Sequence, residues 1–411
     1  TAVLTSLGIA VFIILLRVLG LLQPLELFAY DLLMRLRPPE GQDPYITVVG
    51  ITSGENISDQ ALSDLLEKLS QYDPQVIGLD VYRDIEIGSG PAGRNALVDS
   101  LRAYENVITT CLLTPDGDVK GSSPPDAEIP DERLGFTNLI PDSDNVIRRQ
   151  FLYLEPPEKA SCSIAYPLSL QLAFSYLESQ SPPIASESSE QQYLKLDNTI
   201  FKTLSSRAGG YQTPGIGYIS EGHQILLNYR SPDPQLGSFV TYADWQVMDE
   251  NSPLFNPDDL KGRVVIIGYT SQEAAKNQED LHSTPYSYNW LAKRQMPGVF
   301  IHAHMTSQIL NAVLKGRPLL WSWPGWGECL WIGSWSLVGS GIVWLYRSAS
   351  LWLATGTAVL ALGGCCFMLL WQLGGWIPLI PPALGLILVI LVMQNWQRFL
   401  QRFAIQIQLK Q

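Results

Sequence analysis

The sequence predicts an α/β domain, with a largely parallel or mixed sheet covered by helices, joined to an α-helical membrane region of four spans. Two observations predict the α/β domain. Short β-branched runs alternate with stretches of helical periodicity, and those runs are apolar throughout, as in strands buried on both faces. A third observation predicts the membrane region. Charged residues make up only 16% of the 411 residues, and four apolar stretches approach the ~20 residues that cross a bilayer.

The first predicted span is Ala2 to Leu22, in which Arg17 is the one charge. Its length and the lack of a small-residue cleavage site favour an uncleaved anchor over a signal peptide. We expect the long Arg17 side chain to reach toward an interface or a partner. A second helix, Leu25 to Arg37, is predicted to leave the membrane and to stop at Pro38.

From Tyr45 onward, the sequence predicts alternating strands and helices, an order that implies a parallel sheet with helices on both faces. Ser58 is the predicted N-cap of the first of these helices, and Pro297 starts the last. The predicted strands are 46–51, 76–81, 107–112, 148–154, 224–229 and 264–269. The predicted helices are 58–71, 95–104, 163–178 and 297–314, and the predicted loops are 113–132 and 179–190.

Three more apolar segments form the C-terminal part, namely Trp326–Tyr346, Leu351–Trp371 and Ile377–Trp396. Ten of the 12 Trp residues lie in or next to them, mostly near segment ends, as expected of an interfacial aromatic belt. Short links make neighbouring spans antiparallel. We expect the last helix to be kinked or delayed by its prolines, which are Pro378, Pro381 and Pro382.

The positions of basic residues predict the orientation of the chain in the membrane. Arg347 follows the second span, and Arg398 and Arg402 follow the fourth, so a four-span topology puts all three on the side that the positive-inside rule assigns to the cytoplasm. The N-terminus is then cytoplasmic and the α/β domain extracytoplasmic. The net charge is −12, and the chain up to Pro324 carries −15 of it. Such an acidic domain repels phosphate backbones, so we expect no nucleic acid as a partner.

Five cysteines fall into two groups. Cys329, Cys365 and Cys366 lie in apolar runs and are expected to act as small hydrophobic residues. Cys111 and Cys162 lie in the α/β domain. If that domain faces an oxidising space they are candidates for a disulfide, and the alternative is two unpaired buried thiols.

The candidate ligand-binding residues follow predicted strands, where open α/β sheets bind ligands. Asp80 ends the strand VIGLD, and a ligand contact, a turn cap and a pair with Arg83 are all open readings of it. Asp280, His282 and Thr284 lie in DLHSTP after the strand 264–269, where a ligand contact, an acid–base site and a plain polar loop are alternatives.

His302 is a further candidate ligand contact. It lies two residues from His304 on a predicted helix, so the two rings point in different directions, and we expect helix–sheet packing rather than metal binding. Walker loops, HExxH, nucleophile elbows and paired CxxC motifs are not found in the sequence. We therefore predict no catalytic residues, no metal site and no cofactor.

Several blocks in a fixed order carry a resemblance to a known family: RLRP (Arg35–Pro38), DPYITVVGI (Asp43–Ile51), PQVIGLDV (Pro74–Val81), GFTNLIPDSDNVIRR (Gly135–Arg149), LLNYRSP (Leu226–Pro232), GRVVIIGYT (Gly262–Thr270), DLHSTP (Asp280–Pro285) and MPGVFIHAH (Met296–His304). Together with the topology, they make the chain resemble the second type of CHASE domain, the cyclase- and histidine-kinase-associated sensory extracellular domain. The family commonly has an aromatic-rich stretch after the first strand. Here the segment reads ITSGENISDQ (Ile51–Gln60), so no ligand chemistry is carried over to it.

The resemblance implies a bacterial signalling receptor, with a periplasmic or luminal sensor that passes its signal to an effector. We expect the gene product to continue at one or both ends, and effectors of the family include nucleotide cyclases and kinases. The alternatives are a structural or assembly subunit of a membrane complex, and an extracytoplasmic hydrolase. Membrane lipid and an unknown small ligand or extracytoplasmic protein are the expected partners, and a homo-oligomer is left open. The predicted organisation is an anchor (1–23), a sensory domain (24–320), a three-helix membrane region (321–398) and the start of a cytoplasmic tail (399–411).

Overall fold

The chain folds into two compact units in the computed structural model, which describes residues 2–88, 90–114, 121–126, 128–158, 160–183, 186–189, 193–205, 207–212, 222–277, 279–289, 292–347 and 349–408. One, called here the helical unit, comprises Thr1–Leu36, Ser205–Gly215 and Leu320–Gln411. The other, called here the α/β unit, comprises Arg37–Leu204 and Ile216–Leu319. The boundaries of the four predicted regions stay predictions.

A six-stranded parallel sheet forms the centre of the α/β unit, in the order β11-β1-β12-β2-β3-β4. β12 lies between β1 and β2, so their carboxyl ends meet at one edge of the sheet. The strands are β1 (Ile46–Ile51), β2 (Val76–Leu79), β3 (Val107–Cys111), β4 (Leu134–Phe136), β11 (Val240–Ala243) and β12 (Val264–Tyr269).

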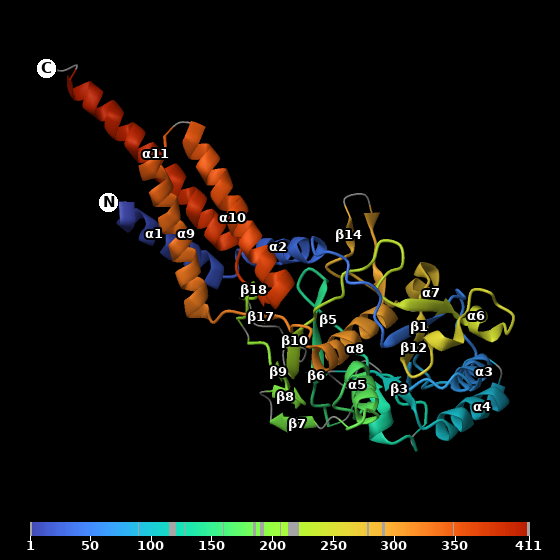
Figure 1. The fold of residues 1–411 in the computed structure, drawn as a ribbon. Coiled ribbons are helices and arrows are strands. Elements are labelled where there is room, and N and C mark those ends of the chain that lie inside the picture. The colour runs from blue at the N-terminus through green and yellow to red at the C-terminus, as the bar shows by residue number, and fades with distance from the viewer. Residues whose placement is uncertain are drawn as a thin grey trace. The chain divides into compact units, whose positions relative to one another are not determined.

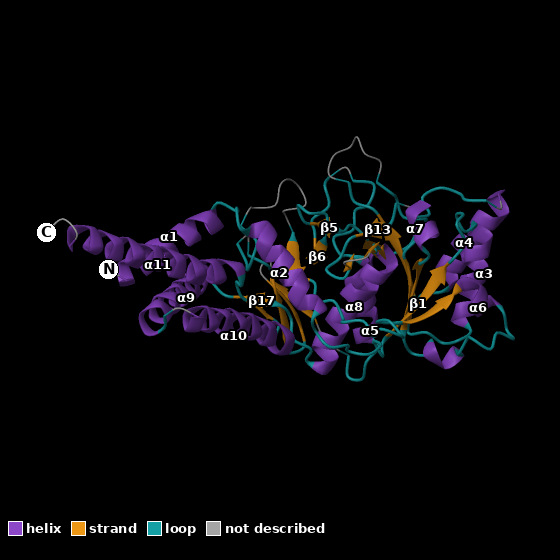
Figure 2. Ribbon diagram, turned by 90° about the horizontal axis from the view of Figure 1, so that it is seen from above, coloured by secondary structure: helices purple, strands orange, loops and turns teal. Residues whose placement is uncertain are grey.

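Helices cover both faces of this sheet, because successive side chains of each strand point to opposite faces and both sets are apolar. Val49 and Val265 face one layer, which contains α3 (Asp59–Ser70), α4 (Gly90–Ala103) and α6 (Asp244–Met248). Val48 and Ile266 face the other layer, with α5 (Leu168–Glu178) and α8 (Gly298–Lys315). Figure 2 shows these two helical layers on either side of the orange strands. The predicted α/β sheet covered by helices is therefore confirmed.

Local signals placed several helix ends correctly. The Ser58 hydroxyl accepts a hydrogen bond from the backbone N–H of Ala61 at 3.2 Å, as an N-cap does. α8 ends at Gly316, whose positive φ of 64° suits a residue without a Cβ. By contrast, α5 begins at Leu168 rather than at Ser163. The chain before it is extended, because the carbonyl of Tyr166 accepts a hydrogen bond from Phe136 of β4.

Smaller sheets complete the α/β unit. β5 (Ile140–Pro141), β6 (Ile147–Tyr153) and β10 (His223–Leu226) form one antiparallel sheet. β7 (Ser186–Ser189), β8 (Tyr193–Leu196) and β9 (Thr199–Lys202) form another. The prediction that 179–190 is all loop was wrong for β7, a polar strand that only pairing with β8 reveals. Short pairs join β13 (Leu281–His282) to β16 (Met296–Pro297) and β14 (Tyr288–Asn289) to β15 (Ala292–Lys293). α7 (Gln272–Asn277), η1 (Asp131–Arg133) and η3 (Pro257–Asp259) are short helices.

The helical unit contains α1 (Ala2–Val18), α2 (Gln23–Arg35), α9 (Gly325–Leu345), α10 (Ala349–Leu373), α11 (Ile380–Gln408) and the pair β17 (Trp321–Ser322) and β18 (Gly375–Trp376). α11 begins after Pro378, so the prolines delay this helix, as predicted. Figure 1 shows α9, α10 and α11 in the orange and red part of the chain.

Two helices of the described residues are long and apolar enough to cross a membrane, within Ala349–Leu373 and Ile380–Phe399. α1 and α2 together meet the same criterion but are bent by 87° at the break between them, so they count as a third span only if the pair is one broken span. α9 does not meet it. Length and composition therefore support two or three spans, and the fourth predicted span is a proposal.

Buried polar contacts hold the helical unit together. Arg17, the charge inside the first predicted span, pairs with Glu328 of α9 at 2.5 Å and donates to the carbonyl of Gly209 at 2.6 Å. The Trp376 side chain is buried against Tyr30 and Tyr211, with ring centroids 4.7 and 5.5 Å away. Arg17 thus finds a partner, which was one of its two predicted roles.

Candidate functional site

Titratable side chains from three parts of the α/β unit meet where β2 and β12 end. Asp80 follows β2, Asp280 and His282 follow α7, and His302 lies in the second turn of α8. The Nε2 atom of His302 lies 3.9 Å from Oδ1 of Asp80, and Nε2 of His282 lies 3.1 Å from Oδ1 of Asp280. Asp80 and Asp280 also act on one another electrostatically. We call these four residues the strand-end cluster.

Asp280 caps α8. Its Oδ2 and its backbone oxygen each accept a hydrogen bond from the N–H of Gly298 at 3.1 Å. A carboxylate is favoured at this position because the N-terminus of a helix carries partial positive charge. A Cβ on Gly298 would lie 2.1 Å from Oδ1 of Asp280, so a larger residue there would displace the capping carboxylate. The cluster therefore contacts the first residue of α8 directly.

Asp80 is in a different environment from Asp280. Burial raises the pKa of its carboxyl group well above the ordinary value, and the nearby Asp280 carboxylate raises it further. Within the part of the chain that the structure describes, the Asp80 side chain forms no hydrogen bond, and its one charge contact is the 3.9 Å approach to His302.

His302 is 3% exposed, and burial lowers its pKa to about 4, which keeps the ring neutral. Its Nδ1 atom is buried without a hydrogen-bond partner among the described residues. Tyr82 lies near the cluster, and its hydroxyl is held at 2.6 Å from Oγ1 of Thr137. Burial raises the pKa of Tyr82, and the charges of Asp80 and Asp280 add to this effect. The cluster thus combines a carboxyl group and an imidazole whose hydrogen-bonding capacity is unused.

Thr284, the fifth predicted residue, shapes a turn instead. Its backbone N–H donates to Oγ of Ser287 at 2.8 Å, and its hydroxyl accepts from the N–H of Tyr286 at 3.3 Å. The turn presents the Tyr286 hydroxyl to Arg37, whose Nη2 donates to it at 3.1 Å. The structure therefore brings four of the five predicted residues together and places Thr284 on the path from them to Arg37.

The pair between Asp80 and Arg83, one of the open readings of Asp80, was wrong. Arg83 pairs with Asp59 at the start of α3, with Nε 3.2 Å from Oδ1, and donates to the carbonyls of Ile57 and Tyr82 at 2.7 Å each. Asp59 is fully buried and was not predicted as a partner. The Arg83 charge is therefore directed away from Asp80.

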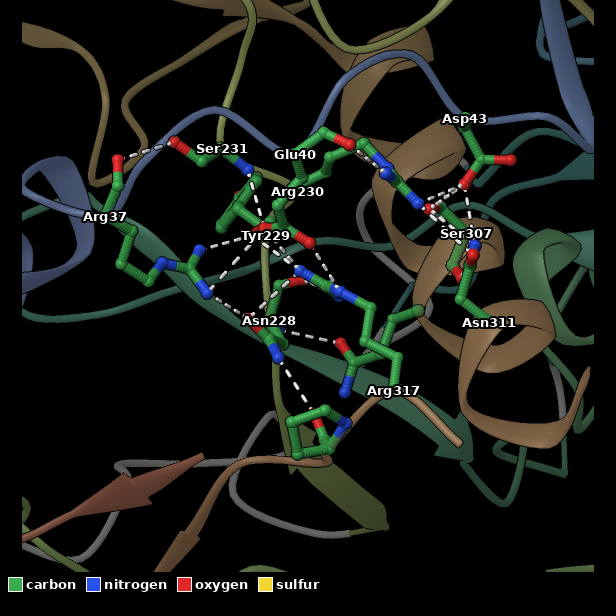
Figure 3. A network of polar contacts seen from close by, with 12 residues as sticks. Arg37, Glu40, Asp43, Asn228, Tyr229, Arg230, Ser231, Ser307, Asn311 and Arg317 are labelled. Carbon is green, nitrogen blue, oxygen red and sulfur yellow. Dashed lines mark hydrogen bonds and ion pairs between the residues drawn. The ribbon is translucent and has the colours of Figure 1, made fainter. Parts of the chain in front are cut away.

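A second polar cluster lies at the other end of α8 (Figure 3). Asp43 is buried at its centre. Its Oδ2 accepts hydrogen bonds from Oγ of Ser307 at 2.5 Å, Nδ2 of Asn311 at 2.7 Å and Nη2 of Arg230 at 3.1 Å. The segment before β1, the loop after β10 and α8 therefore share one carboxylate. We call this set the exit cluster, and it also includes Arg37, Glu40, Asn228, Tyr229, Ser231 and Arg317.

Glu40 and Arg317 form the part of the exit cluster nearest the ends of the α/β unit. Arg317 donates from Nε to Oε2 of Glu40 at 2.8 Å and from Nη2 to Oε1 at 3.0 Å, a two-pronged geometry that is stronger than a single contact (Figure 3). Burial raises the pKa of Glu40, but the charge and hydrogen bonds of Arg317 outweigh it, so the net shift is downward. The segment entering the unit after Leu36 is thus clamped to the segment leaving it before Leu320.

The exit cluster was not predicted from the sequence. Arg37, Asp43 and Arg230 lie in the quoted blocks RLRP, DPYITVVGI and LLNYRSP, so charged residues in those blocks were the available signal, whereas Ser307 and Asn311 lie in α8 outside all of the blocks. The place of His304 next to this cluster was likewise not predicted. His304 faces the exit cluster, where its Nδ1 accepts from the N–H of Arg230 at 3.3 Å, while His302 faces the strand ends. Burial lowers the pKa of His304 to about 3.

The structure joins Cys111 of β3 to Cys162 as a disulfide, with Cα atoms 5.6 Å apart and both residues fully buried. This separation is within the range that a disulfide spans. Among the described residues no three His, Cys, Asp or Glu side chains are grouped so that they could hold a metal ion.

A comparison with models of protein families identifies the family of this chain. The model of the CHASE2 domain matches residues 8–341, which is most of the chain. The chain belongs to the CHASE2 family. CHASE2 is an extracellular sensory domain family rather than a catalytic one, so the predicted resemblance is confirmed and a sensory role is supported. No curated protein and no solved structure matches this chain.

The CHASE2 match begins within α1 and ends within α9, so it includes both clusters. With two apolar helices after it, the chain has the features of a membrane-anchored sensory protein.

Proposed function

We propose that this CHASE2 protein is the sensory input module of a bacterial signalling receptor, with the α/β unit outside the cytoplasm. A small ligand or an extracytoplasmic protein binds at the strand-end cluster. Binding shifts the population between two positions of α8, and the chain after α8 passes this bias to the membrane helices and to a cytoplasmic effector. Four spans, with Arg347, Arg398 and Arg402 on the cytoplasmic side, give the topology that this role requires.

The observation that carries the proposal is that α8 connects the two clusters. Asp280 caps its first residue, Gly298, and its last turns supply Ser307 and Asn311 to Asp43. Fourteen of its 18 residues are buried, so a shift at one end is transmitted through a packed element rather than absorbed by solvent-exposed chain.

The link after α8 supports transmission to the membrane. Arg317 is held by Glu40 and by the carbonyls of Asn228 and Tyr229 at 2.8 and 3.1 Å. Pro318 and Pro324 restrict the link, and a short proline-containing segment transmits displacement better than a long flexible one. In this proposal, the short link absorbs little of a displacement of α8, so the displacement reaches the start of α9.

The test perturbs the cap of α8 and measures a response in α9. In native membranes, with Cys329, Cys365 and Cys366 changed to Ser, a single cysteine replaces Trp344, which is 81% exposed. Asp280→Ala removes the cap, at a local cost of about 1 kcal/mol. We expect it to change the labelling rate at position 344, whereas Asp280→Asn, which can still accept from Gly298, should change it less.

A Gly-Ser insertion after Arg317 is the decisive variant. It should abolish the effect of Asp280→Ala on labelling, because the flexible link absorbs the movement of α8. The same insertion after Asn198, in the exposed turn between β8 and β9, is the control and should preserve the effect. A labelling response that survives the insertion after Arg317 would show that the link is a passive tether.

A further inference from the structure

The strand-end cluster also indicates the chemical class of its ligand, an inference that rests on the proposed role of this cluster as the sensory site. Its charges are two carboxyl groups, Asp80 and Asp280. The charged side chain that acts on Asp80 is Asp280 and not a Lys or Arg, since the nearby Arg83 is directed to Asp59. An anionic ligand would therefore be repelled, and a cationic one would compensate the site.

The hydrogen-bonding groups of the site indicate which kind of cationic ligand it could bind. Oδ1 of Asp80 and Nε2 of His302 are 3.9 Å apart, too far for a direct hydrogen bond. A third atom at about 2.9 Å from both fits this separation, with an angle of about 85° between its two contacts. The buried Nδ1 of His302 has no partner among the described residues, and a neutral imidazole has one nitrogen that accepts. A group that donates several N–H bonds would use the Asp80 carboxylate and the one accepting ring nitrogen of His302.

Metal ions fit less well. Zinc sites use three or four protein ligands, and the described residues contain no such group of His, Cys, Asp and Glu. Asp280 is already committed to Gly298 and His282, which leaves Asp80 and His302 for the ligand.

We propose that the strand-end cluster binds a primary ammonium group, held by the carboxylate of Asp80 and one ring nitrogen of His302, with Asp280 supplying a second, more distant negative charge. The ligand is then an alkyl amine or amino alcohol without a carboxylate next to its ammonium group. Binding at this point displaces the cluster that caps α8.

The experiment uses the full chain in nanodiscs and the probe propylammonium chloride at constant ionic strength. The readouts are the unfolding temperature and the apparent affinity from its dependence on probe concentration. We expect the probe to raise the unfolding temperature. Sodium propionate has the same size and the opposite charge, and trimethylpropylammonium has the charge without N–H donors, so neither should.

Variants connect the effect to the site. Asp80→Asn should weaken the apparent affinity for propylammonium at least tenfold, equivalent to ~1.4 kcal/mol. Asp84→Asn removes an exposed carboxylate four residues away and should leave the affinity unchanged. His302→Gln, which keeps an acceptor, should retain more affinity than His302→Phe, and this pair tests the site even if Asp80→Asn folds poorly.

The pH profile separates this site from a general salt effect. Asp80 faces Asp280, the loop residue Tyr82 and, from α8, His302, on which His282 also acts. Because the pKa of Asp80 is raised, its carboxylate fraction grows as pH rises, so the affinity for propylammonium should increase between pH 5 and pH 8. Asp80→Asn should flatten that increase.

An equal response to trimethylpropylammonium, or an unchanged affinity in Asp80→Asn, would overturn the proposal. Failure of the proposed function gives a different pattern. Propylammonium would then bind with the expected variant profile, while Asp280→Ala would leave labelling of α9 unchanged.

Discussion

The surroundings of the Asp80 carboxyl group favour its protonated form. The Asp80 side chain is only 10% exposed, the Asp280 carboxylate acts on it, and among the described residues it has no Arg or Lys partner, because Arg83 pairs with Asp59. An ionised carboxylate in such a place costs free energy that the folded unit has to offset elsewhere. Perturbed groups of this kind concentrate at functional sites, which agrees with a sensory role for the cluster.

Asp80→Asn should stabilise the α/β unit at neutral pH. With its pKa raised on folding, wild-type Asp80 favours the fold while protonated, and this contribution is lost as pH rises from the unfolded-state value through the folded one. The Asn side chain of the variant does not ionise, so the variant's stability does not decrease in this way as pH rises. We expect its unfolding temperature to exceed that of the wild type by roughly 2–4 °C at pH 8, about 1 kcal/mol, and the difference to shrink toward pH 4.

His302 provides the internal control for that measurement. Its pKa is lowered to about 4, so its own contribution to stability is lost as pH falls from about 6.5 through that value. Between pH 6 and pH 8 the folded-state His302 ring is neutral in both proteins, so the difference over this range reports on Asp80. A difference that is constant from pH 4 to pH 8 would contradict the assigned environment of Asp80.

At the scale of elements, α8 is the helix on which both clusters depend. Its apolar side chains pack on the sheet, while His302, His304, Ser307 and Asn311 are polar and buried. Buried polar groups on one helix specify a unique position for it only when each has its partner, which makes this helix sensitive to changes at either end.

Asn311→Ala should destabilise the α/β unit by about 1–3 kcal/mol, because Asp43 loses the donor at 2.7 Å and remains buried. Chemical denaturation of the full chain measures this change. Asn251→Ala, at an exposed position, should change the free energy of unfolding by less than about 0.5 kcal/mol. Equal effects of the two variants would show that Asp43 does not depend on Asn311.

The disulfide is a second link between elements, joining β3 to the segment before α5. Because its Cα atoms are 5.6 Å apart, we expect non-reducing peptide mapping to find Cys111 linked to Cys162 in protein isolated from cells. Cys162→Ser should lower the free energy of unfolding by about 2–4 kcal/mol. Recovery of both cysteines as alkylated free thiols would refute the link.

On the scale of the whole molecule, the topology is the open prediction. A cysteine at Asn198, in the α/β unit, should react with an impermeant reagent applied to spheroplasts with an intact inner membrane. A cysteine at Ser350, at the start of α10, should react only after permeabilisation, since Arg347 places this link in the cytoplasm. Both cysteines reacting on the same side would exclude the four-span arrangement, because an odd number of crossings must separate them.

Local sequence signals were enough to predict the regular strands and several helix ends of this protein. β1 and β12 match their predicted ranges because apolar β-branched runs bounded by turn residues are a local signal, and Ser58 and Gly316 mark helix ends through their own backbone chemistry. The strand-end rule also selected Asp80 and Asp280 as candidates, since the carboxyl ends of parallel strands meet at one edge, whereas His302 was chosen from a predicted helix. That these residues bind a ligand stays a prediction.

Which polar groups pair depends on the tertiary fold. Arg83 pairs with Asp59 rather than with Asp80, Tyr286 in the turn after Thr284 accepts from Arg37, and Asp43 accepts from Ser307 and Asn311 across more than 260 residues of sequence. β7 likewise is a strand through its partner β8 and not through its own composition. The physical reason is that helix and strand propensities act within a few residues, whereas burial, hydrogen-bond partners and pKa shifts depend on which distant segments the fold brings together.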